Sequence, residues 1–426
     1  MNPHDNFEIR CPVHGFVALN DWERQIIEES AYQRLRRIRQ LAWTDQVYPG
    51  AMHTRFEHSL GVMHTAGLLF DSIVRNSAIV LHDELGYDEA GFKRYRQLVR
   101  LAALVHDVGH SPFSHASEEL FPDVENGGRK FSHEQYSGAI VRGPLRKAIE
   151  DHKLNGNYNF TADDIAALLE GSAGARQGSF WRDLIAGQMD ADRMDYLIRD
   201  SHHAGVNYGR YDLHRLIATV TAIPGLKSGP RIGIQSGGWH AAEALVIARY
   251  FMFTQVYFHK TRVAYDIHIR EAMKEILPGG CFPKPDSDGL DEFLKWDDWR
   301  VLGLLASGAG GEHGHRLSSR HHYRLAYQTK EVQTADEGDK LQRVRECLGR
   351  LVVAEMLAGK SKKWYKTDDA DIPVYEEEGQ NGPVPLSAYS SVVRNLGIND
   401  QVLLYCLPEH KAEAAKKVKE ALNGMA

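Results

Sequence analysis

A polar pair, His106 and Asp107, closes a largely apolar helix, and this arrangement constrains the fold more than any other feature of the chain. The preceding residues 97–105 (Gln-Leu-Val-Arg-Leu-Ala-Ala-Leu-Val) are typical of a helix with a buried face. Gly109 and Pro112 then end the helix. A buried charge at this point requires a partner or a metal ion. Polar residues from elsewhere in the chain are therefore expected to meet the pair.

His58 and Asp192 are the expected partners. His58 lies in residues 53–61 (His-Thr-Arg-Phe-Glu-His-Ser-Leu-Gly), and Asp192 lies in 189–196 (Met-Asp-Ala-Asp-Arg-Met-Asp-Tyr). Each piece alone favours hydrogen-bonded core residues, whereas the three segments together favour a metal site. Two imidazoles and two carboxylates suit a divalent first-row ion and leave positions for water and phosphate. Mn²⁺, Mg²⁺, Fe²⁺, Zn²⁺ and Ni²⁺ all fit this set, which indicates hydrolysis of a phosphate ester.

Composition restricts the class of protein. The 426 residues are 43% hydrophobic and 25% charged, as in a soluble globular protein with one large domain or two. The net charge of −6 gives no overall attraction to nucleic acid. Apolar stretches are too short to cross a membrane. The widely spaced cysteines predict neither a zinc finger nor a disulfide framework and favour the reducing cytoplasm; they are Cys11, Cys281, Cys347 and Cys406.

Helical periodicity dominates the first two thirds of the chain. It predicts helices at 21–41, 57–77, 96–107, 114–121, 132–152, 162–170, 180–201, 210–221 and about 239–275. Residues 7–20 are expected to be extended or turn structure, and 231–235 form a short strand. Residues 279–319 are rich in glycine and proline and predict a linker or loop-rich segment. A strand at 402–408 and a helix at 409–422 indicate a small α+β lobe over 320–426.

Seven segments carry the pattern of a known family. They are 12–15 (Pro-Val-His-Gly), 32–41 (Tyr-Gln-Arg-Leu-Arg-Arg-Ile-Arg-Gln-Leu), 49–61 (Pro-Gly-Ala-Met-His-Thr-Arg-Phe-Glu-His-Ser-Leu-Gly), 106–115 (His-Asp-Val-Gly-His-Ser-Pro-Phe-Ser-His), 132–135 (Ser-His-Glu-Gln), 192–200 (Asp-Arg-Met-Asp-Tyr-Leu-Ile-Arg-Asp) and 202–205 (His-His-Ala-Gly). These residues resemble the HD-domain phosphohydrolases, with ligand pattern His…His-Asp…Asp. Within them the chain is most similar to deoxynucleoside triphosphate (dNTP) triphosphohydrolases, which include bacterial dGTP-activated enzymes and a mammalian enzyme with a sterile-alpha-motif domain. The resemblance covers roughly residues 8 to 275.

The resemblance implies an all-helical HD-domain core over 1–278. With the loop-rich segment 279–319 and the α+β lobe over 320–426, the chain is expected to be mainly α. The resemblance also implies that water attacks the α-phosphorus of a dNTP and the 5′ oxygen leaves, giving deoxynucleoside and inorganic triphosphate. Two alternatives stay open. One is an HD phosphohydrolase acting on nucleoside monophosphates, cyclic dinucleotides or guanosine alarmones. The other is a nucleotide-sensing or nucleic-acid-binding module, although the acidic net charge argues against a dedicated DNA-binding protein.

Departure of the leaving group requires a proton donor near neutral pH, and imidazole is the natural one. His110, His115 and His133 crowd the region of the His-Asp pair. Glu118 lies three residues after His115, so that on a helix it would fix the tautomer of that ring. The related enzymes have Asp at the position of Glu118. The alternative is that these four residues are helix caps or buried polar groups.

Candidate substrate contacts surround the ligands. Arg55 lies three residues before His58 on the same helical face, where it suits a phosphate group. The resemblance implies that Tyr196 excludes a ribose hydroxyl, that Gln40 and Leu41 meet the deoxyribose, and that other residues contact the pocket or the triphosphate. These others are Arg193 (usually Lys in the family), Asp200, His259, Lys260 and Arg262.

The resemblance further implies a homo-oligomer, a dimer or tetramer, with dGTP or GTP activator sites at subunit interfaces. Glu28, Gln33 and Arg36 match the positions of such a site, and Arg324 is a further candidate from the C-terminal lobe. Glu28 would accept hydrogen bonds from guanine, and Arg36 would bind phosphate. The alternative is an ordinary salt-bridged helix surface.

Overall fold

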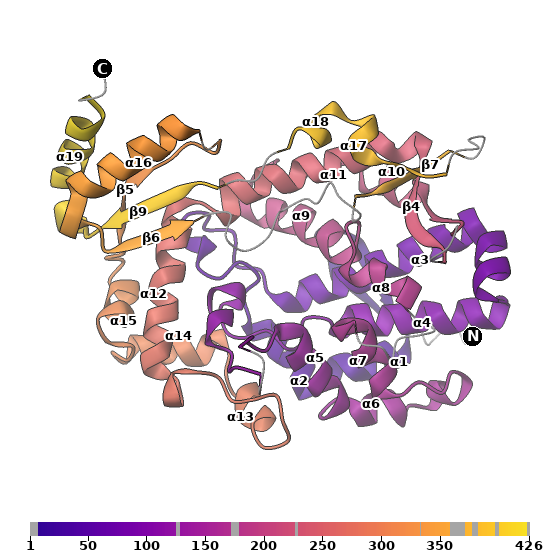
Figure 1. The fold of residues 1–426 in the computed structure, drawn as a ribbon. Coiled ribbons are helices and arrows are strands. Elements are labelled where there is room, and N and C mark those ends of the chain that lie inside the picture. The colour runs from indigo at the N-terminus through magenta and orange to yellow at the C-terminus, as the bar shows by residue number, and fades with distance from the viewer. Residues whose placement is uncertain are drawn as a thin grey trace.

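The computed structural model describes residues 7–124, 128–171, 179–225, 229–332, 334–357, 371–376, 382–396 and 400–423. Its helices pack into one large body, and a small three-stranded sheet with helices α16 and α19 stands against one end of it (Figure 1). The predicted mainly α class with a small α+β lobe is confirmed.

An antiparallel hairpin precedes the first helix. Strands β1 (Phe7–Cys11) and β2 (Gly15–Leu19) pair from Phe7↔Leu19 to Cys11↔Gly15. Gly15 closes the turn with φ 76°, a backbone conformation that glycine adopts without strain. Val17 and Leu19 are buried, which anchors the hairpin on the helical body and places His14 of the turn beside it.

Helix α3 (Arg55–Leu85) is the longest element of the body. It begins with a reciprocal capping box in which Thr54 and Glu57 satisfy each other's backbone N–H groups. The sequence predicted residues 57–77. Ser77 is indeed non-helical (φ −144°, ψ 26°), but the chain resumes the helix beyond it. The Ser77 hydroxyl bonds Thr221 Oγ1 at 2.6 Å and thus ties the kink to strand β3 (Val220–Ile223).

Helix α4 (Glu89–Val105) packs along α3 and delivers the polar pair. It begins one turn or more before the predicted residue 96, because the Asp88 side chain caps it by accepting the Gly91 N–H at 2.8 Å. Its last turns, residues 101–105, are fully buried. His106 and Asp107 therefore emerge inside the protein.

Several predicted helices are broken in the structure. The predicted 21–41 divides into two short helices and a 3-10 turn at an extended Glu29, and the predicted 114–121 is two 3-10 turns. The predicted 132–152 divides into α5 (His133–Arg142) and α6 (Arg146–Glu150), because Gly143 and Pro144 interrupt it. The predicted 180–201 divides into α8 (Ser179–Ala186) and α9 (Ala191–Ala204). The Asp190 side chain starts α9 by accepting the Arg193 N–H at 2.7 Å, and Gly205 (φ 70°) ends it.

The predicted long helix 239–275 is also divided. Helix α11 (Trp239–Met252) continues into a π-helical turn, Phe253–Tyr257, and α12 (Lys260–Ile276) follows. The ring of His259 caps α12 by accepting the Thr261 N–H at 3.3 Å. π-Helical turns occur often at functional sites.

The segment 279–319, predicted to be loop-rich, contains three helices: α13 (Leu290–Leu294), α14 (Asp298–Ala306) and α15 (Gly311–Ser318). The side chain of Asp297 caps α14 through the Arg300 N–H at 2.8 Å. Buried Asp298 accepts the backbone N–H groups of Arg39 and Phe113 at 2.9 and 2.8 Å. Tertiary contacts of this kind override the glycine-rich composition and hold the loops next to the polar pair.

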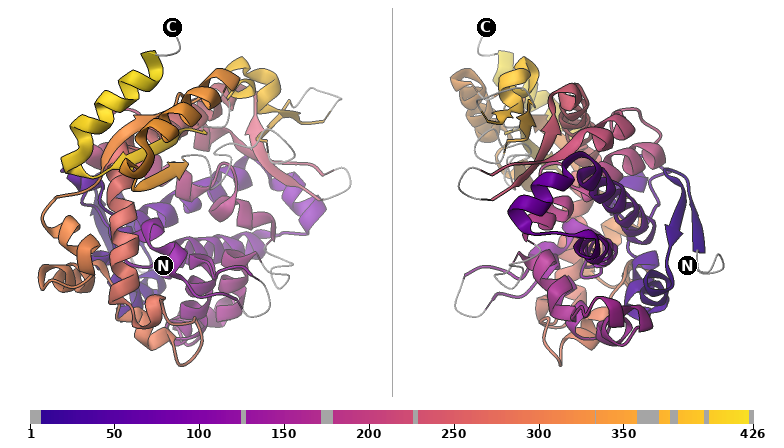
Figure 2. Two further views of the ribbon diagram at one scale, coloured as in Figure 1. Left: turned by 60° about the vertical axis from the view of Figure 1, so that its left-hand side comes forward. Right: turned by 90° about the vertical axis from the view of Figure 1, so that its right-hand side faces the viewer.

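The C-terminal lobe is built on a sheet of order β5-β9-β6, from β5 (Arg324–Gln328), β9 (Val402–Cys406) and β6 (Ala354–Leu357). Alternate residues of β9 face opposite sides. Leu403 and Tyr405 pack on α12, whereas Val402, Leu404 and Cys406 pack on α16 (Ala335–Leu348) and α19 (Lys411–Asn423). Both faces of β9 are thus covered by helices. Figure 2 shows the molecule from two further sides.

Residues 371–376 and 382–396 lie against the helical body and not in this lobe, which the sequence did not indicate. Strand β7 (Pro373–Tyr375) pairs in parallel with β4 (Arg231–Gln235), and β8 (Val384–Pro385) pairs with β7. Helices α17 (Leu386–Tyr389) and α18 (Ser391–Arg394) pack on α11.

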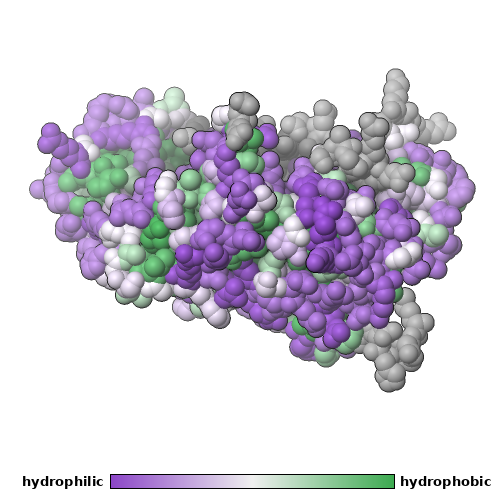
Figure 3. All heavy atoms as spheres, turned by 90° about the horizontal axis from the view of Figure 1, so that it is seen from below, coloured by the Kyte–Doolittle hydropathy of each residue, from purple (hydrophilic) through white to green (hydrophobic). Residues whose placement is uncertain are grey.

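The remaining helices are α1 (Asp21–Glu28), α2 (Ser30–Gln33), α7 (Ala162–Glu170) and α10 (Leu213–Thr219). Helix α7 and strand β4 have the predicted bounds. Seen from below, the surface is mainly hydrophilic, with hydrophobic residues in small groups (Figure 3). Within the described ranges, no helix combines the length and apolar character that a membrane span requires.

Candidate metal centre

The fold brings the four predicted ligands together from three elements: His58 from the first turns of α3, His106 and Asp107 from the end of α4, and Asp192 from the first turn of α9. His58 Nε2 lies 3.0 Å from Asp192 Oδ1 and 3.7 Å from Asp107 Oδ2. His106 Nε2 lies 3.2 Å from Asp107 Oδ1 and 3.8 Å from Asp192 Oδ1. Asp192 is the most accessible, with 35% of its side chain exposed. The site therefore opens toward solvent along α9.

Hydrogen bonds on the far side of the His58 and His106 rings hold each ring so that its Nε2 faces the carboxylates. His106 Nδ1 lies 2.8 Å from the Ala103 carbonyl, which can only accept, so this nitrogen carries the proton. Its Nε2 is buried and has no hydrogen-bond partner among the described residues. His58 Nδ1 lies 2.8 Å from Asp195 Oδ2 in the same way. Nε2 of each ring thus faces the carboxylates of Asp107 and Asp192, and this set fits a divalent cation once His58 releases its Nε2 proton.

Charge at this site reflects the same arrangement. Burial alone would lower the pKa of His58, but its hydrogen bonds to Asp192 and Asp195 outweigh burial and raise the pKa to about 10. Burial would raise the pKa of Asp107, but the Arg55 cation and the neighbouring histidines hold it well below the usual range. Both carboxylate ligands are ionised, and a cation entering the site displaces a proton from His58.

Asp195 orients His58 and was not predicted to have a role. It is fully buried and accepts hydrogen bonds from His58 Nδ1 (2.8 Å), His14 Nε2 (2.6 Å) and both Arg199 donors (2.7 and 2.8 Å). His14 reaches it from the amino-terminal hairpin. The sequence signal was its position three residues after Asp192, which places both carboxylates on one side of α9.

Replacing Asp195 by Asn is expected to weaken binding of the metal about 10- to 100-fold, as for other residues that orient a metal-binding histidine. The amide keeps the shape of the side chain but removes the negative charge that holds the His58 ring in its orientation. Calorimetric titration with Mn²⁺ measures the effect. An affinity equal to that of the wild type would show that Asp195 acts only in packing, and Asp83→Asn, on the exposed end of α3, serves as the matched control.

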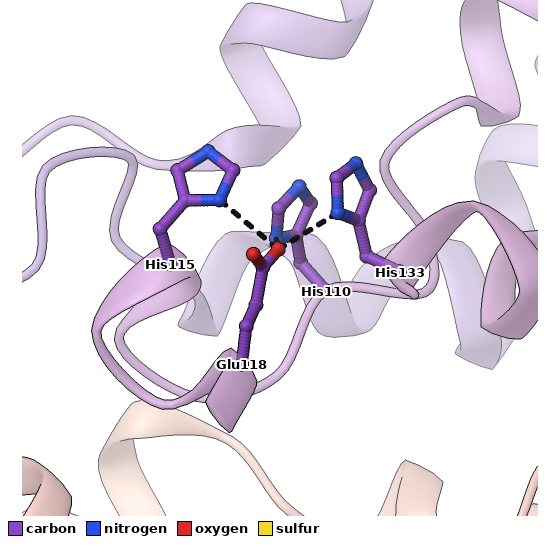
Figure 4. Close-up of side chains that lie close together, drawn as sticks. All are labelled: His110, His115, Glu118 and His133. Carbon is purple, nitrogen blue, oxygen red and sulfur yellow. Dashed lines mark hydrogen bonds and ion pairs between the residues drawn. The ribbon is translucent and has the colours of Figure 1, made fainter. Parts of the chain in front are cut away.

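A second cluster lies beside the polar pair and contains the four residues predicted to be catalytic. Glu118 Oε1 lies 2.7 Å from His133 Nδ1, 3.0 Å from His115 Nδ1 and 3.7 Å from His110 Nδ1. His115 and His133 lie on either side of the carboxylate, with His110 behind it (Figure 4). His110 Nε2 lies 3.1 Å from Asp107 Oδ1, which connects the cluster to the candidate metal ligands.

Two residues of this cluster differ in charge. Burial would lower the pKa of His133, but the Glu118 carboxylate outweighs burial and raises it to about 9. Burial and the nearby cations Arg55 and His133 lower the pKa of His110 well below its usual range. At neutral pH His133 is thus a cation and His110 is neutral. The cluster therefore holds a proton next to the candidate metal ligands.

Arg55 occupies the predicted position beside the ligands. Its Nη1 lies 2.5 Å from Asp107 Oδ2, and its Nε donates to Ser114 Oγ at 2.8 Å. With both bonds made, its planar guanidinium is held at the edge of the site. The same group can contact Asp107 and a substrate oxygen.

The predicted contacts on α9 line up along this helix. Arg193 Nη1 pairs with Asp190 Oδ2 at 2.5 Å. The Tyr196 ring lies 6.1 Å from that of Tyr257 in an edge-to-face arrangement. Asp200 accepts Tyr257 OH at 2.6 Å and bonds His53 Nε2 at 2.7 Å. Neither Tyr257, from the π-helical turn, nor His53, which lies in the matched segment 49–61, was predicted to take part in the site.

Gln40 and Leu41 are both buried at the end of the segment that precedes the ligands. The Gln40 backbone N–H donates to the His53 carbonyl at 3.0 Å, which fixes it near the His53–Asp200 pair. Its side-chain Oε1 is buried without a hydrogen-bond partner in the described part of the chain. A buried acceptor of this kind fits a ligand hydroxyl.

The basic residues around α12 are less closely tied to the site. Lys260 is exposed, and His259 is the cap of the helix. Arg262 donates to the Tyr257 carbonyl and pairs with Asp266 at 3.4 Å. Arg262 thus contacts the π-helical turn rather than the predicted ligands.

Arg249 on α11 is a site residue that the sequence analysis missed. Its Nε is buried without a hydrogen-bond partner within the described residues. Burial lowers the pKa of its guanidinium, the Tyr196 hydroxyl opposes this, and the Arg193 cation lowers it further. A charged residue inside the apolar run Ala-Leu-Val-Ile-Ala-Arg was the available signal. Arg193 and Arg249 are thus two neighbouring cations beside Asp190, and such a pair suits a polyanionic ligand.

Three of the four residues predicted to bind an activator, Glu28, Gln33 and Arg36, lie in or next to α1 and α2. Glu28 is 62% exposed and lies 3.4 Å from Arg24. Arg36 Nε donates to Gln33 Oε1 at 2.8 Å, and its guanidinium covers the Phe56 ring at 3.5 Å. Arg324 begins β5 and contacts His322, and no described interaction joins it to the other three.

The chain matches two family models. The description "HD domain" matches residues 55–200, which contain all four candidate ligands, and "HD associated region" matches residues 211–362. The chain is 36% identical over 269 residues to an uncharacterized protein of Methanocaldococcus jannaschii, covering 63% of this chain and 49% of that protein. It is 33% identical over 292 residues to the deoxynucleoside triphosphate triphosphohydrolase SAMHD1 homolog of Dictyostelium discoideum, covering 67% and 50%.

A solved structure resembles the whole fold. The crystal structure of a hypothetical protein from Aquifex aeolicus has a TM-score of 0.77 and 26% identity, and the match covers 97% of this chain and 100% of that one. The chain spans about half the length of the curated relatives it matches.

Proposed function

We propose that this chain, which carries an HD domain followed by an HD-associated region, is a metal-dependent phosphohydrolase that converts dNTPs to deoxynucleoside and inorganic triphosphate. The observation that carries the proposal is the convergence of two imidazole Nε2 atoms and two carboxylates from α3, α4 and α9. The printed names of two relatives, the SAMHD1 proteins of Dictyostelium discoideum and Gallus gallus, favour the dNTP substrate.

His58, His106, Asp107 and Asp192 would hold one divalent ion. When bound, the ion supplies Lewis-acid polarisation of phosphate and a more acidic water. Arg55, fixed by Asp107 and Ser114, is positioned to bind an α-phosphate oxygen. Arg193 and Arg249 lie farther along α9 and α11 and suit the β- and γ-phosphates.

The leaving 5′ oxygen requires a proton, and the Glu118 cluster holds one. His133 is protonated at neutral pH because its carboxylate partner raises its pKa to about 9. His115 is 62% exposed and reaches Glu118 from the solvent side. We assign His115 and His133 to proton delivery and Glu118 to holding both rings. Neutral His110 connects this cluster to Asp107.

Preference for deoxy over ribo substrates is expected, by about 10²-fold in kcat/KM. The Tyr196 ring packs near Tyr257, and the unpaired Gln40 Oε1 suits a sugar hydroxyl, so that the sugar would be held tightly. Parallel assays of the four dNTPs and GTP measure the ratio. Equal kcat/KM values for dGTP and GTP would contradict this assignment.

The same assay tests the proposed function against its alternatives. A panel of dNTPs, nucleoside monophosphates, a cyclic dinucleotide and a guanosine alarmone is incubated with Mn²⁺-loaded protein. The proposal predicts the highest kcat/KM for a dNTP. If the protein turned over only a monophosphate, a cyclic dinucleotide or an alarmone, the dNTP assignment would be rejected. The assignment of the metal site would be unaffected.

Nucleotide activation is expected to involve Glu28, Gln33 and Arg36. Adding dGTP or GTP should raise the rate on another dNTP by about 5- to 150-fold, the usual range of allosteric coupling, and increase the oligomeric mass. Arg36→Ala removes a phosphate-binding cation and should abolish the increase. Rate measurements combined with light scattering check this. A rate independent of added nucleotide, with a monomer throughout, would contradict it.

A further inference from the structure

The Glu118 cluster is itself a set of metal-type donors, separate from the four candidate ligands. One nitrogen each from His110, His115 and His133 and a Glu118 oxygen lie within 4.8 Å of one another. Three loops or short turns deliver them: residues 106–112, the 3-10 turns around 114–120, and the start of α5. Figure 4 shows the three rings facing one carboxylate.

The tautomer of His110 leaves an unpaired lone pair aimed into this cluster. His110 Nε2 lies 3.1 Å from Asp107 Oδ1, and the carboxylate can only accept a hydrogen bond, so Nε2 carries the proton. His110 Nδ1 is therefore an acceptor. The ring is 1% exposed, and Nδ1 has no hydrogen-bond partner in the described ranges. It faces Glu118 Oε1 at 3.7 Å, so that two acceptors point toward one another.

Two facing acceptors in a buried site repel unless a cation or proton lies between them. His115 and His133 supply protons to Glu118 in the present arrangement. Neither reaches His110 Nδ1 through any described hydrogen bond. Loss of the two Nδ1 protons would give three imidazole nitrogens and one carboxylate oxygen around one point. Such a set suits Zn²⁺ or a similar first-row ion.

We propose that His110, His115, Glu118 and His133 form a second divalent-cation site, whose occupation inhibits hydrolysis. The inhibitory part rests on the proposed function, because a cation bound to His115 and His133 would replace the protons that these rings deliver. The binding part is independent of any substrate. A cation in the first site would thus support the reaction. A cation in the second site, bound at a higher cation concentration, would stop it.

Equilibrium dialysis of the full chain against Zn²⁺, followed by elemental analysis, tests the binding. The wild type should hold two ions per chain. Glu118→Gln and His115→Ala should each hold one; His115 is 62% exposed, so its removal leaves no cavity in the core. His58→Ala should also hold one, through loss of the other site. His82→Ala, an exposed histidine on α3, is the matched control and should hold two.

One ion per chain in the wild type, or the same stoichiometry in Glu118→Gln and the wild type, would overturn the proposal. Titration of Zn²⁺ into Mn²⁺-loaded protein then tests inhibition on a dNTP. The wild-type rate should fall as the second ion binds, and the residual activity of His115→Ala should not. Two bound ions with no loss of rate would retain the site and reject its inhibitory role, whereas absence of any hydrolysis would reject the proposed function alone.

Discussion

Replacing Asp107 by Ala is expected to abolish both metal content and hydrolysis. The Asp107 carboxylate lies within 4 Å of a side-chain nitrogen of His58, His106, His110 and Arg55. Its loss therefore removes a candidate ligand and also the partner that holds the His110 and Arg55 side chains in place. Metal catalysis contributes several kcal/mol, so the rate should fall by about 10³-fold or more. Elemental analysis and a dNTP assay measure both effects.

The matched control is Asp83→Asn, which alters a carboxylate on the exposed end of the same helix as His58. It should keep the metal and full activity. Asp107→Ala protein that still binds the metal and turns over dNTP at the wild-type rate would show that the reaction takes place elsewhere.

Replacing Glu118 by Gln is expected to lower kcat by about 10²- to 10⁴-fold, the range of general acid catalysis. It should also change the pH profile. In the wild type, Glu118 raises the pKa of His133 to about 9, so the acid form persists until the pH approaches that value. The wild-type rate should therefore decline as pH rises through about 9. Without the carboxylate the pKa falls, and the decline should begin at lower pH.

Profiles of kcat against pH for both proteins check this. An unchanged alkaline limb in Glu118→Gln would show that the ion pair does not control the proton donor. The same pair affects stability: since the folded-state pKa of His133 exceeds its ordinary value of 6.5, its contribution is complete below about 6.5 and is lost as pH rises through about 9.

The four candidate ligands could be selected from the sequence because their chemistry is unusual in context. His106 and Asp107 end an apolar helix, and charged residues are rarely buried without partners. His58 and Asp192 were selected because they complete a set of two imidazoles and two carboxylates with this pair. The sequence could not predict which residues form hydrogen bonds to these candidate ligands. Asp195 and His14 are separated by 181 positions, and their 2.6 Å contact depends on how the hairpin docks on the body.

Several predicted helix boundaries differ from the observed ones, and the structure shows the physical reasons. Gly143 and Pro144 break one predicted helix, whereas Asp190 caps a new one inside another. The segment 279–319 has a loop-like composition, yet Asp298 accepts two backbone N–H groups from distant loops and holds α14 in place. The pairing of β7 with β4 joins residues far apart in the chain, and local patterns carry no information on it.

The most direct test of the central claim is product analysis after hydrolysis of a dNTP in isotopically labelled water. The account predicts inorganic triphosphate carrying the label on its former α-phosphorus, together with unlabelled deoxynucleoside. Mass spectrometry of both products measures this. Release of pyrophosphate with nucleoside monophosphate, of orthophosphate with nucleoside diphosphate, or label in the deoxynucleoside would contradict it.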